Sequence, residues 1–103
     1  MIILIKEKSL IARIAALFLH EKSIAVVTGK TIHLWNTSKE DFINNKKWLQ
    51  HELMHVQQFK KYGFIRFLFL YTWESLKKGY HKNRFEVEAR GAENNNILSY
   101  HVH

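Results

Sequence analysis

Apolar and polar positions near the start of the chain follow a helical period. Between residues 8 and 20, the apolar side chains that share one side of a helix are Leu10, Ile11, Ile14, Leu17 and Phe18. Residues three and four apart lie on one helix face, so we expect an amphipathic helix whose apolar stripe covers the core. An export signal is the alternative, but Arg13 interrupts the apolar run and no small-residue cleavage site follows it.

Two runs rich in β-branched and apolar residues come next, over residues 23–27 and Thr31–Trp35. They surround the tripeptide Thr28-Gly29-Lys30. Two such runs around a short glycine-containing segment predict a short β-hairpin.

Three helices are expected after the hairpin, over about residues 39–62, 64–78 and from 83 onwards. Thr37 or Ser38 would cap the first of them, and Gly63 would end it. The second would end at Gly79. The last would fade within the run Asn94-Asn95-Asn96. With four helices and one hairpin, we predict a single α+β domain over residues 1–103 that is mostly helical.

Residues 64–73 form the other strongly apolar stretch. Ten residues cannot span a bilayer, and Arg66 lies inside the stretch. We therefore expect no transmembrane segment and a cytoplasmic protein in which this stretch is a buried helix. Contact with a membrane surface is the alternative.

Composition restricts the chemistry. The chain has 103 residues and no cysteine, so disulfides and thiolate metal ligands are excluded. A metal could bind only through histidine and carboxylate side chains, which is typical of catalytic rather than structural zinc sites. The net charge of +7 is spread over the chain without a long basic run. A solvated surface explains it, and a nucleic-acid partner is not expected, although an anionic lipid or an acidic partner would fit the charge.

The segment His51-Glu52-Leu53-Met54-His55 reads H-E-x-x-H. On a helix, residues four apart lie one above the other, so both imidazoles can bind one metal ion. Glu52 lies about 100° further round the helix, where it can reach a metal-bound water without binding the ion. The motif predicts a zinc site with Glu52 as general base.

A third ligand is expected from another helix. The candidates are Glu86, Glu88, Glu93, His81, His101 and His103. The buried stripe expected on the last helix passes between Glu86 and Glu88, so periodicity does not choose between these two acids. Gln58 lies one turn after His55 and could hydrogen-bond around the site.

Two segments carry a family resemblance. Residues 51–58 read H-E-L-M-H-V-Q-Q, and residues 80–89 read Y-H-K-N-R-F-E-V-E-A. Together they resemble the minimal zincin domains, small gluzincin-type proteins with H-E-x-x-H-x-x-Q followed by Y…N-x-F-E-x-E-A. The resemblance covers about residues 46–92.

More distantly, the second segment is similar to that of the membrane proteases that cleave prenylated CaaX proteins. Their E-x-x-A-D segment gives its first glutamate to zinc, which implies Glu86 as the third ligand here. Arg90 stands where those proteases have an aspartate that contacts a ligand histidine, and Glu88 is the candidate to replace that contact.

The motif and the resemblance together predict a zinc metallopeptidase that hydrolyses a peptide or protein substrate. Glu52 would accept the proton of the attacking water. Tyr80 is the expected donor to the oxygen that gains negative charge, with His81 and Tyr62 as alternatives. As in zincins, the strand before the metal-binding helix, Thr31–Trp35, would offer its edge to an extended peptide.

Three other functions compete with this prediction. A non-catalytic binding module could be stabilised by the same zinc ion, although the presence of Glu52 favours an enzyme. A basic nucleic-acid-associated protein is suggested by charge alone. A regulatory zinc protease that cleaves a repressor would usually carry a helix-turn-helix partner, which the sequence does not show.

Overall fold

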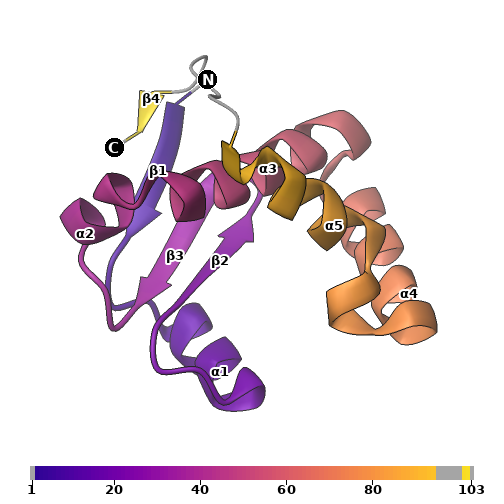
Figure 1. The fold of residues 1–103 in the computed structure, drawn as a ribbon, viewed down its shortest axis with the longest axis horizontal. Coiled ribbons are helices and arrows are strands. Elements are labelled where there is room, and N and C mark those ends of the chain that lie inside the picture. The colour runs from indigo at the N-terminus through magenta and orange to yellow at the C-terminus, as the bar shows by residue number, and fades with distance from the viewer. Residues whose placement is uncertain (1, 95–100, 103) are drawn as a thin grey trace.

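The computed structural model describes residues 2–94 and 101–102. The elements are β1 (Ile2–Lys6), α1 (Leu10–Leu19), β2 (Ile24–Thr28), β3 (Thr31–Trp35), α2 (Lys39–Asn44), α3 (Lys46–Tyr62), α4 (Phe64–Lys82), α5 (Arg84–Gly91), a 3-10 turn (Ala92–Asn94) and β4 (His101–Val102). A small mixed sheet is followed by helices that make up most of the chain, which confirms the predicted α+β class (Figure 1).

The sheet has the strand order β2-β3-β1-β4. β2 and β3 form the predicted antiparallel hairpin, with Thr28 paired to Thr31 and Gly29 at a φ of 67° in the two-residue loop. β1 is a strand that the sequence pattern did not predict, and it pairs parallel with β3 and β4. The expectation that Thr31–Trp35 offers a free edge is therefore wrong, because β3 lies between β2 and β1, and the edge strands of the described sheet are β2 and β4.

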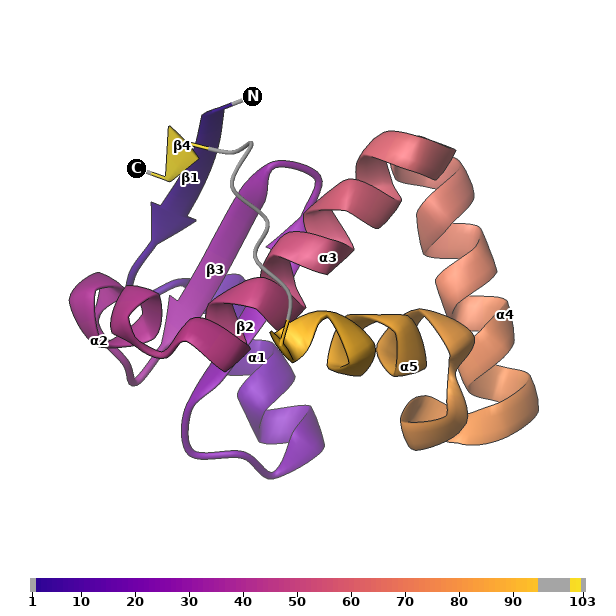
Figure 2. The ribbon, with the colours of Figure 1, turned by 45° about the horizontal axis from the view of Figure 1, so that its top comes forward.

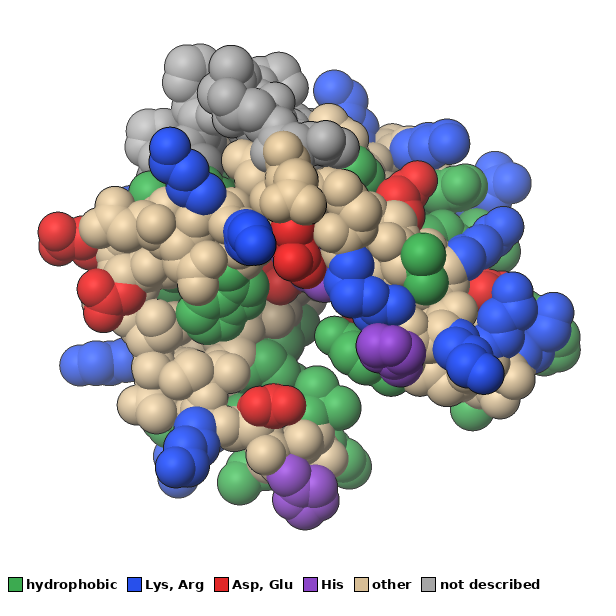
Figure 3. Space-filling model, in the orientation of Figure 1, with side chains coloured by type: hydrophobic (Ala, Val, Ile, Leu, Met, Phe, Trp, Pro, Cys, Tyr) green, Lys and Arg blue, Asp and Glu red, His purple; other side chains and the backbone are tan. Residues whose placement is uncertain are grey.

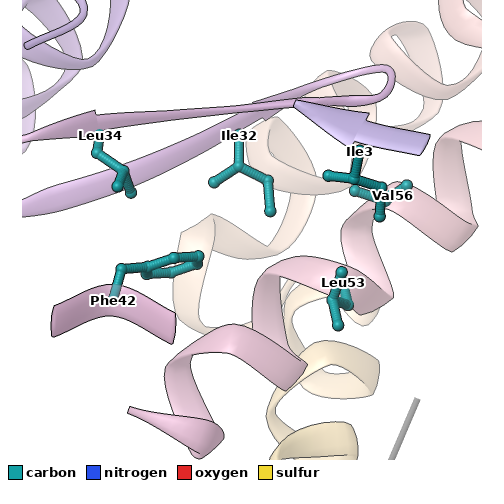
Figure 4. Packing of buried hydrophobic residues seen from close by; sticks show 6 residues of the cluster. All are labelled: Ile3, Ile32, Leu34, Phe42, Leu53 and Val56. Carbon is teal, nitrogen blue, oxygen red and sulfur yellow. The ribbon is translucent and has the colours of Figure 1, made fainter. Parts of the chain in front are cut away.

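Helices lie on both faces of this sheet (Figure 2). α2 and α3 pack on one face, and α1 packs on the other against β2 and β3. The main core lies between the sheet and the α2–α3 layer (Figure 4), and its fully buried members are Ile3, Ile32, Leu34, Phe42, Leu53 and Val56. One face of α3 is thereby fixed against the sheet.

The orientation of α1 is opposite to the predicted one. Ala12 and Ala16 are buried against the sheet, whereas Leu17 and Phe18 are 69% and 81% exposed. Alanine side chains allow the helix to lie close to the strands, so the small residues occupy the interface and the large apolar stripe faces outward. Periodicity identified the stripe but not the side that packs.

The helix expected over residues 39–62 is two helices. Ser38 caps α2, as one of the two predicted caps, and its side chain accepts a hydrogen bond from the amide of Asp41. The chain then leaves helical geometry at Asn45, whose Oδ1 accepts from the amide of Trp48 and starts α3. Asparagine is a favoured cap because its side chain satisfies a free amide of the first turn. Gly63 ends α3, as predicted.

α4 buries one side in a second cluster, formed by Phe59, Phe67 and Phe85. Its opposite side is exposed, so the expected buried helix over residues 64–73 is buried on one side only. Gly79, at φ 80° and ψ 165°, interrupts the helix where the sequence predicted its end, but Tyr80 and His81 form a further helical turn instead of a loop. Within residues 2–94 and 101–102, no helix is long and apolar enough to cross a membrane.

Asn83 connects α4 to α5. Its side chain is fully buried and accepts from the amide of Phe85 at 2.8 Å, which caps α5. Its Nδ2 donates to the carbonyl of Tyr71 at 3.1 Å and to Oγ of Ser75 at 2.8 Å. These bonds hold α5 at a fixed position against α4 and set the direction in which Glu86 points.

Candidate metal centre

Three side chains from two helices meet at one point. His51 and His55 come from α3, and Glu86 comes from the first turn of α5. Oε1 of Glu86 lies 3.1 Å from Nε2 of His51 and 3.2 Å from Nε2 of His55. The three ligand atoms all lie within 4.8 Å of one another. The structure thus brings together the two motif histidines and one of the three candidate acids.

The other ring nitrogen of each histidine faces an acceptor. Nδ1 of His51 lies 2.9 Å from Oε2 of Glu93, and Nδ1 of His55 lies 2.8 Å from Oε1 of Gln58. Each Nδ1 therefore carries a proton and donates it, so that when the ring is neutral the Nε2 lone pair faces the common point. Glu93, a candidate ligand in the sequence, serves instead to orient His51.

Gln58 is fixed by its other contacts. Its Nε2 donates to the carbonyl of Phe85 at 3.0 Å and to Oε1 of Glu88 at 2.7 Å, both of which can only accept. Its Oε1 must then face His55. The expectation that Gln58 hydrogen-bonds around the site is confirmed. Glu88 contacts Gln58 and not His55, so it does not make the contact to a ligand histidine that was expected of it. Glu93 makes such a contact to His51, and Gln58 makes one to His55.

The charges of the cluster are strongly coupled. Burial disfavours the ionised form of Glu86, but its hydrogen bonds with His51 and His55 outweigh burial and hold the pKa of Glu86 far below its ordinary value. Burial alone would lower the pKa of His51, but hydrogen bonds with Glu86 and Glu93 and the charge of Glu52 raise that pKa to about 9. The pKa of His55 is also raised against burial, mainly by Glu86. The cluster therefore attracts positive charge.

The donor set fits a zinc ion. Zinc binds imidazole nitrogen at about 2.0–2.1 Å and carboxylate oxygen at about 2.0–2.2 Å, so neighbouring ligands of a tetrahedral ion lie about 3.3–3.5 Å apart. The separations of 3.1 and 3.2 Å are close to this spacing. Two neutral nitrogens and a carboxylate oxygen would otherwise repel one another, so either protons or a cation must lie between them.

Tyr71 is a site residue that the sequence interpretation missed. Its hydroxyl donates to Oε2 of Glu86, the oxygen that does not face the histidines. Burial and the charge of Glu86 raise the pKa of Tyr71 well above its ordinary value, so the hydroxyl stays protonated. Tyr71 lies within the apolar stretch of α4, and only its position one turn after the buried Phe67 could have indicated that it faces α5.

Glu52 is buried beside the cluster and points into the same space. Burial raises the pKa of Glu52 to about 7, although the neighbouring His55 and His51 charges oppose this. A carboxyl group with a pKa near neutrality can both accept and release a proton. Glu52 lines two adjoining hollows on either side of the metal-binding residues.

The two hollows differ in character. One, of about 330 Å³, is apolar and runs between α1, β2 and α4, where Phe59, Phe67 and Leu68 line it together with His55 and Glu86. The other is more polar and lies on the His51 side, with Lys47, Asn45 and Glu93 in its wall. Both contact the edge strand β2.

The remaining sequence candidates are placed as follows. Tyr80 is 53% exposed and lines both hollows. Tyr62 packs on Phe67 and Phe85 in the second cluster, and His81 is exposed with its carbonyl accepting from Arg90. His103 lies outside the described residues, as does the side chain of His101.

We compared the chain with protein-family models, with curated proteins and with solved structures, and none of them matches it. The class of protein defined by fold and site is therefore a small α+β domain with a candidate His-His-Glu metal centre.

Proposed function

We propose that the chain is a zinc-dependent metallopeptidase of the minimal zincin type, which hydrolyses a peptide bond in a peptide or protein substrate. One observation carries this proposal: Glu52 is a buried carboxyl group beside the His51–His55–Glu86 centre, and it lines a hollow that is bounded by the edge strand β2. A metal that only stabilised the fold would need no carboxylate in that place. The H-E-x-x-H motif places Glu52 and two of the three candidate metal ligands, His51 and His55, on one helix.

His51, His55 and Glu86 would hold the ion, and a bound zinc ion would polarise the scissile carbonyl and acidify water. Glu52 would take the proton from the attacking water and transfer it to the leaving nitrogen as the C–N bond breaks. Tyr80, which lines the same space, would donate its hydroxyl proton in a hydrogen bond to the carbonyl oxygen as negative charge develops there.

The substrate would bind along β2. An edge strand has backbone N–H and C=O groups free to pair with an extended peptide. β2 contacts both hollows, so such a peptide would cross the centre with one side chain directed to the apolar hollow. This binding mode replaces the one expected at β3.

Metal content is the first test. Elemental analysis of natively purified protein should give zinc near one ion per chain. His51→Ala and Glu86→Ala should each lower the zinc affinity by at least about tenfold, and with it the zinc content, since each removes one of three ligands. His81→Ala, an exposed histidine outside the centre, is the matched control and should retain full zinc. A wild type that cannot be loaded with zinc would exclude the proposal.

Catalysis is tested separately on zinc-loaded protein with a peptide library. Glu52→Gln should retain zinc and lose about 10²–10⁴-fold in the rate of hydrolysis. Tyr80→Phe should lower the rate without changing zinc content. If the wild type binds zinc but cleaves no peptide, or if Glu52→Gln cleaves as well as the wild type, the zinc-stabilised binding module becomes the better interpretation.

A further inference from the structure

The outward side of α4 is an apolar stripe. Ile65, Phe69, Trp73 and Leu76 recur at spacings of four, four and three residues, and they are 73%, 76%, 58% and 79% exposed. The side of the helix that packs on the protein is occupied by Phe67. A surface helix normally directs its polar side to solvent, so the exposed side of α4 has the reverse polarity.

α1 repeats this arrangement. Its buried side consists of alanines, and Leu10, Ile14, Leu17 and Phe18 form an exposed stripe at spacings of four, three and one residues. α1 and α4 lie on opposite sides of the apolar hollow, and hydrophobic side chains are visible on both sides of it in Figure 3. Large apolar side chains exposed together along a helix are a mark of an interaction site.

The segment around α4 also carries a concentration of positive charge, with seven of the 16 basic residues of the chain. Residues 60–84 contain seven basic side chains, and these are Lys60, Lys61, Arg66, Lys77, Lys78, Lys82 and Arg84. The only acidic residue in that segment, Glu74, is buried and forms an ion pair with Lys78 at 3.3 Å. Lys and Arg side chains are prominent over the α4–α5 side in Figure 3. Any partner of this surface must therefore accept both apolar side chains and a concentration of positive charge.

We propose that α1 and α4 bind the surface of an anionic lipid bilayer, with the apolar stripes inserted among the lipids and the basic side chains at the headgroups. A helix with large apolar residues on one side and cations beside them is typical of binding in the plane of the interface. A second copy of the chain would bring two segments of the same charge together, which disfavours a dimer through this surface.

Vesicle flotation with the full chain tests this. The protein should float with vesicles of phosphatidylcholine mixed with phosphatidylserine and much less with phosphatidylcholine alone. Each cationic side chain near an anionic surface contributes about fivefold in affinity, so added salt should weaken the binding. Phe69→Ser and Leu76→Ser should each reduce the partition coefficient by about tenfold or more, because each removes a large inserted side chain.

Matched variants separate binding from folding. Phe69 and Leu76 are more than three-quarters exposed, so their serine variants should keep the melting temperature of the wild type. Val87→Ser, which changes a residue 51% exposed on α5, is the control and should bind vesicles normally. Trp73→Phe should also bind, but it should lose the blue shift of tryptophan emission that the wild type shows on vesicle binding.

Three results would overturn the proposal. One is no flotation with anionic vesicles, which would point to an acidic protein partner. Another is equal binding to neutral and anionic vesicles. The third is a dimer in light scattering that Phe69→Ser dissociates, which would assign the surface to a second copy of the chain.

Discussion

Gln58 offers a sharp test of how the histidines are oriented. Its side chain is 2% exposed and makes three hydrogen bonds, to His55, to the carbonyl of Phe85 and to Glu88. Gln58→Leu keeps the volume but leaves Nδ1 of His55 without its acceptor, and it removes the bonds that the Phe85 carbonyl and Glu88 accept from Gln58. A buried unpaired group costs about 1–3 kcal/mol, so the free energy of unfolding should fall by about that amount or more.

The same substitution should weaken zinc binding. Residues that orient ligand histidines contribute about 10–100-fold to metal affinity. Gln58→Glu separates the two effects, because its carboxylate still accepts from His55 but cannot donate to Phe85 or Glu88. It should therefore lose stability and retain zinc affinity. Gln57→Leu, at the neighbouring position, is the control and should change neither quantity.

The assays are urea denaturation of the metal-free protein and zinc titration against a competing chromophoric chelator. The titration is carried out at a temperature at which each variant is folded by circular dichroism. If folded Gln58→Leu binds zinc within about twofold of the wild type, Gln58 does not fix the orientation of His55, and the argument for aligned Nε2 lone pairs is refuted.

Further predictions concern the fold. Ala16→Leu should lower the free energy of unfolding by about 1–3 kcal/mol by overfilling the contact between α1 and the sheet, whereas Leu17→Ser should change it by less than about 0.5 kcal/mol. Equal losses in urea denaturation would contradict the orientation of α1. Gly29→Ala should cost about 1–2 kcal/mol in the same assay, because the φ of 67° strains an alanine and its Cβ would lie 3.4 Å from the ring of Phe64. An unchanged stability would be inconsistent with this turn. Burial lowers the pKa of His33 below 6.5, so the stability that depends on its neutral form is complete above pH 6.5 and is lost as the pH falls toward the lowered pKa. His33→Gln should show a shallower loss of stability than the wild type in denaturation curves below pH 6.5, and parallel curves would disprove the assignment.

Local signals in the sequence were sufficient where one residue type has one strong preference. Gly63 ends α3 and Ser38 caps α2 because backbone geometry and the first free amides demand such residues. The i, i+4 spacing places His51 and His55 on one helix face in any context. Asn45 carries an equally clear capping signal, and reading it as one would have divided the helix expected over residues 39–62.

Tertiary packing decided which side of α1 is buried and which glutamate of α5 joins the centre. The stripe of α1 could be located from periodicity, but whether Leu17 or Ala16 faces the sheet depends on how close the helix lies to the strands. Likewise, the sequence pattern left Glu86 and Glu88 equivalent. The choice follows from the position of α5, which the buried Asn83 fixes through its bonds to α4.

Helix α3 belongs to two hydrophobic clusters at once. Leu53 and Val56 lie in the core beneath the sheet, while Phe59, at the C-terminal end, packs with α4 and α5 in the second cluster. We expect such an arrangement to form two cooperative units that share one helix, and we expect the unit with the smaller cluster to open while the other stays folded. The candidate centre joins α3 to α5 across this division.

A zinc ion at that position would therefore hold α5 against α3 and oppose the opening of the smaller unit. Backbone amides of α5 should exchange with solvent much more slowly when the ion is bound, whereas amides of β3, beneath the main core, should be protected in both states. Opening of the α4–α5 unit and release of the ion would then be one event, so the lifetime of the bound metal would report the rate at which this part of the domain unfolds.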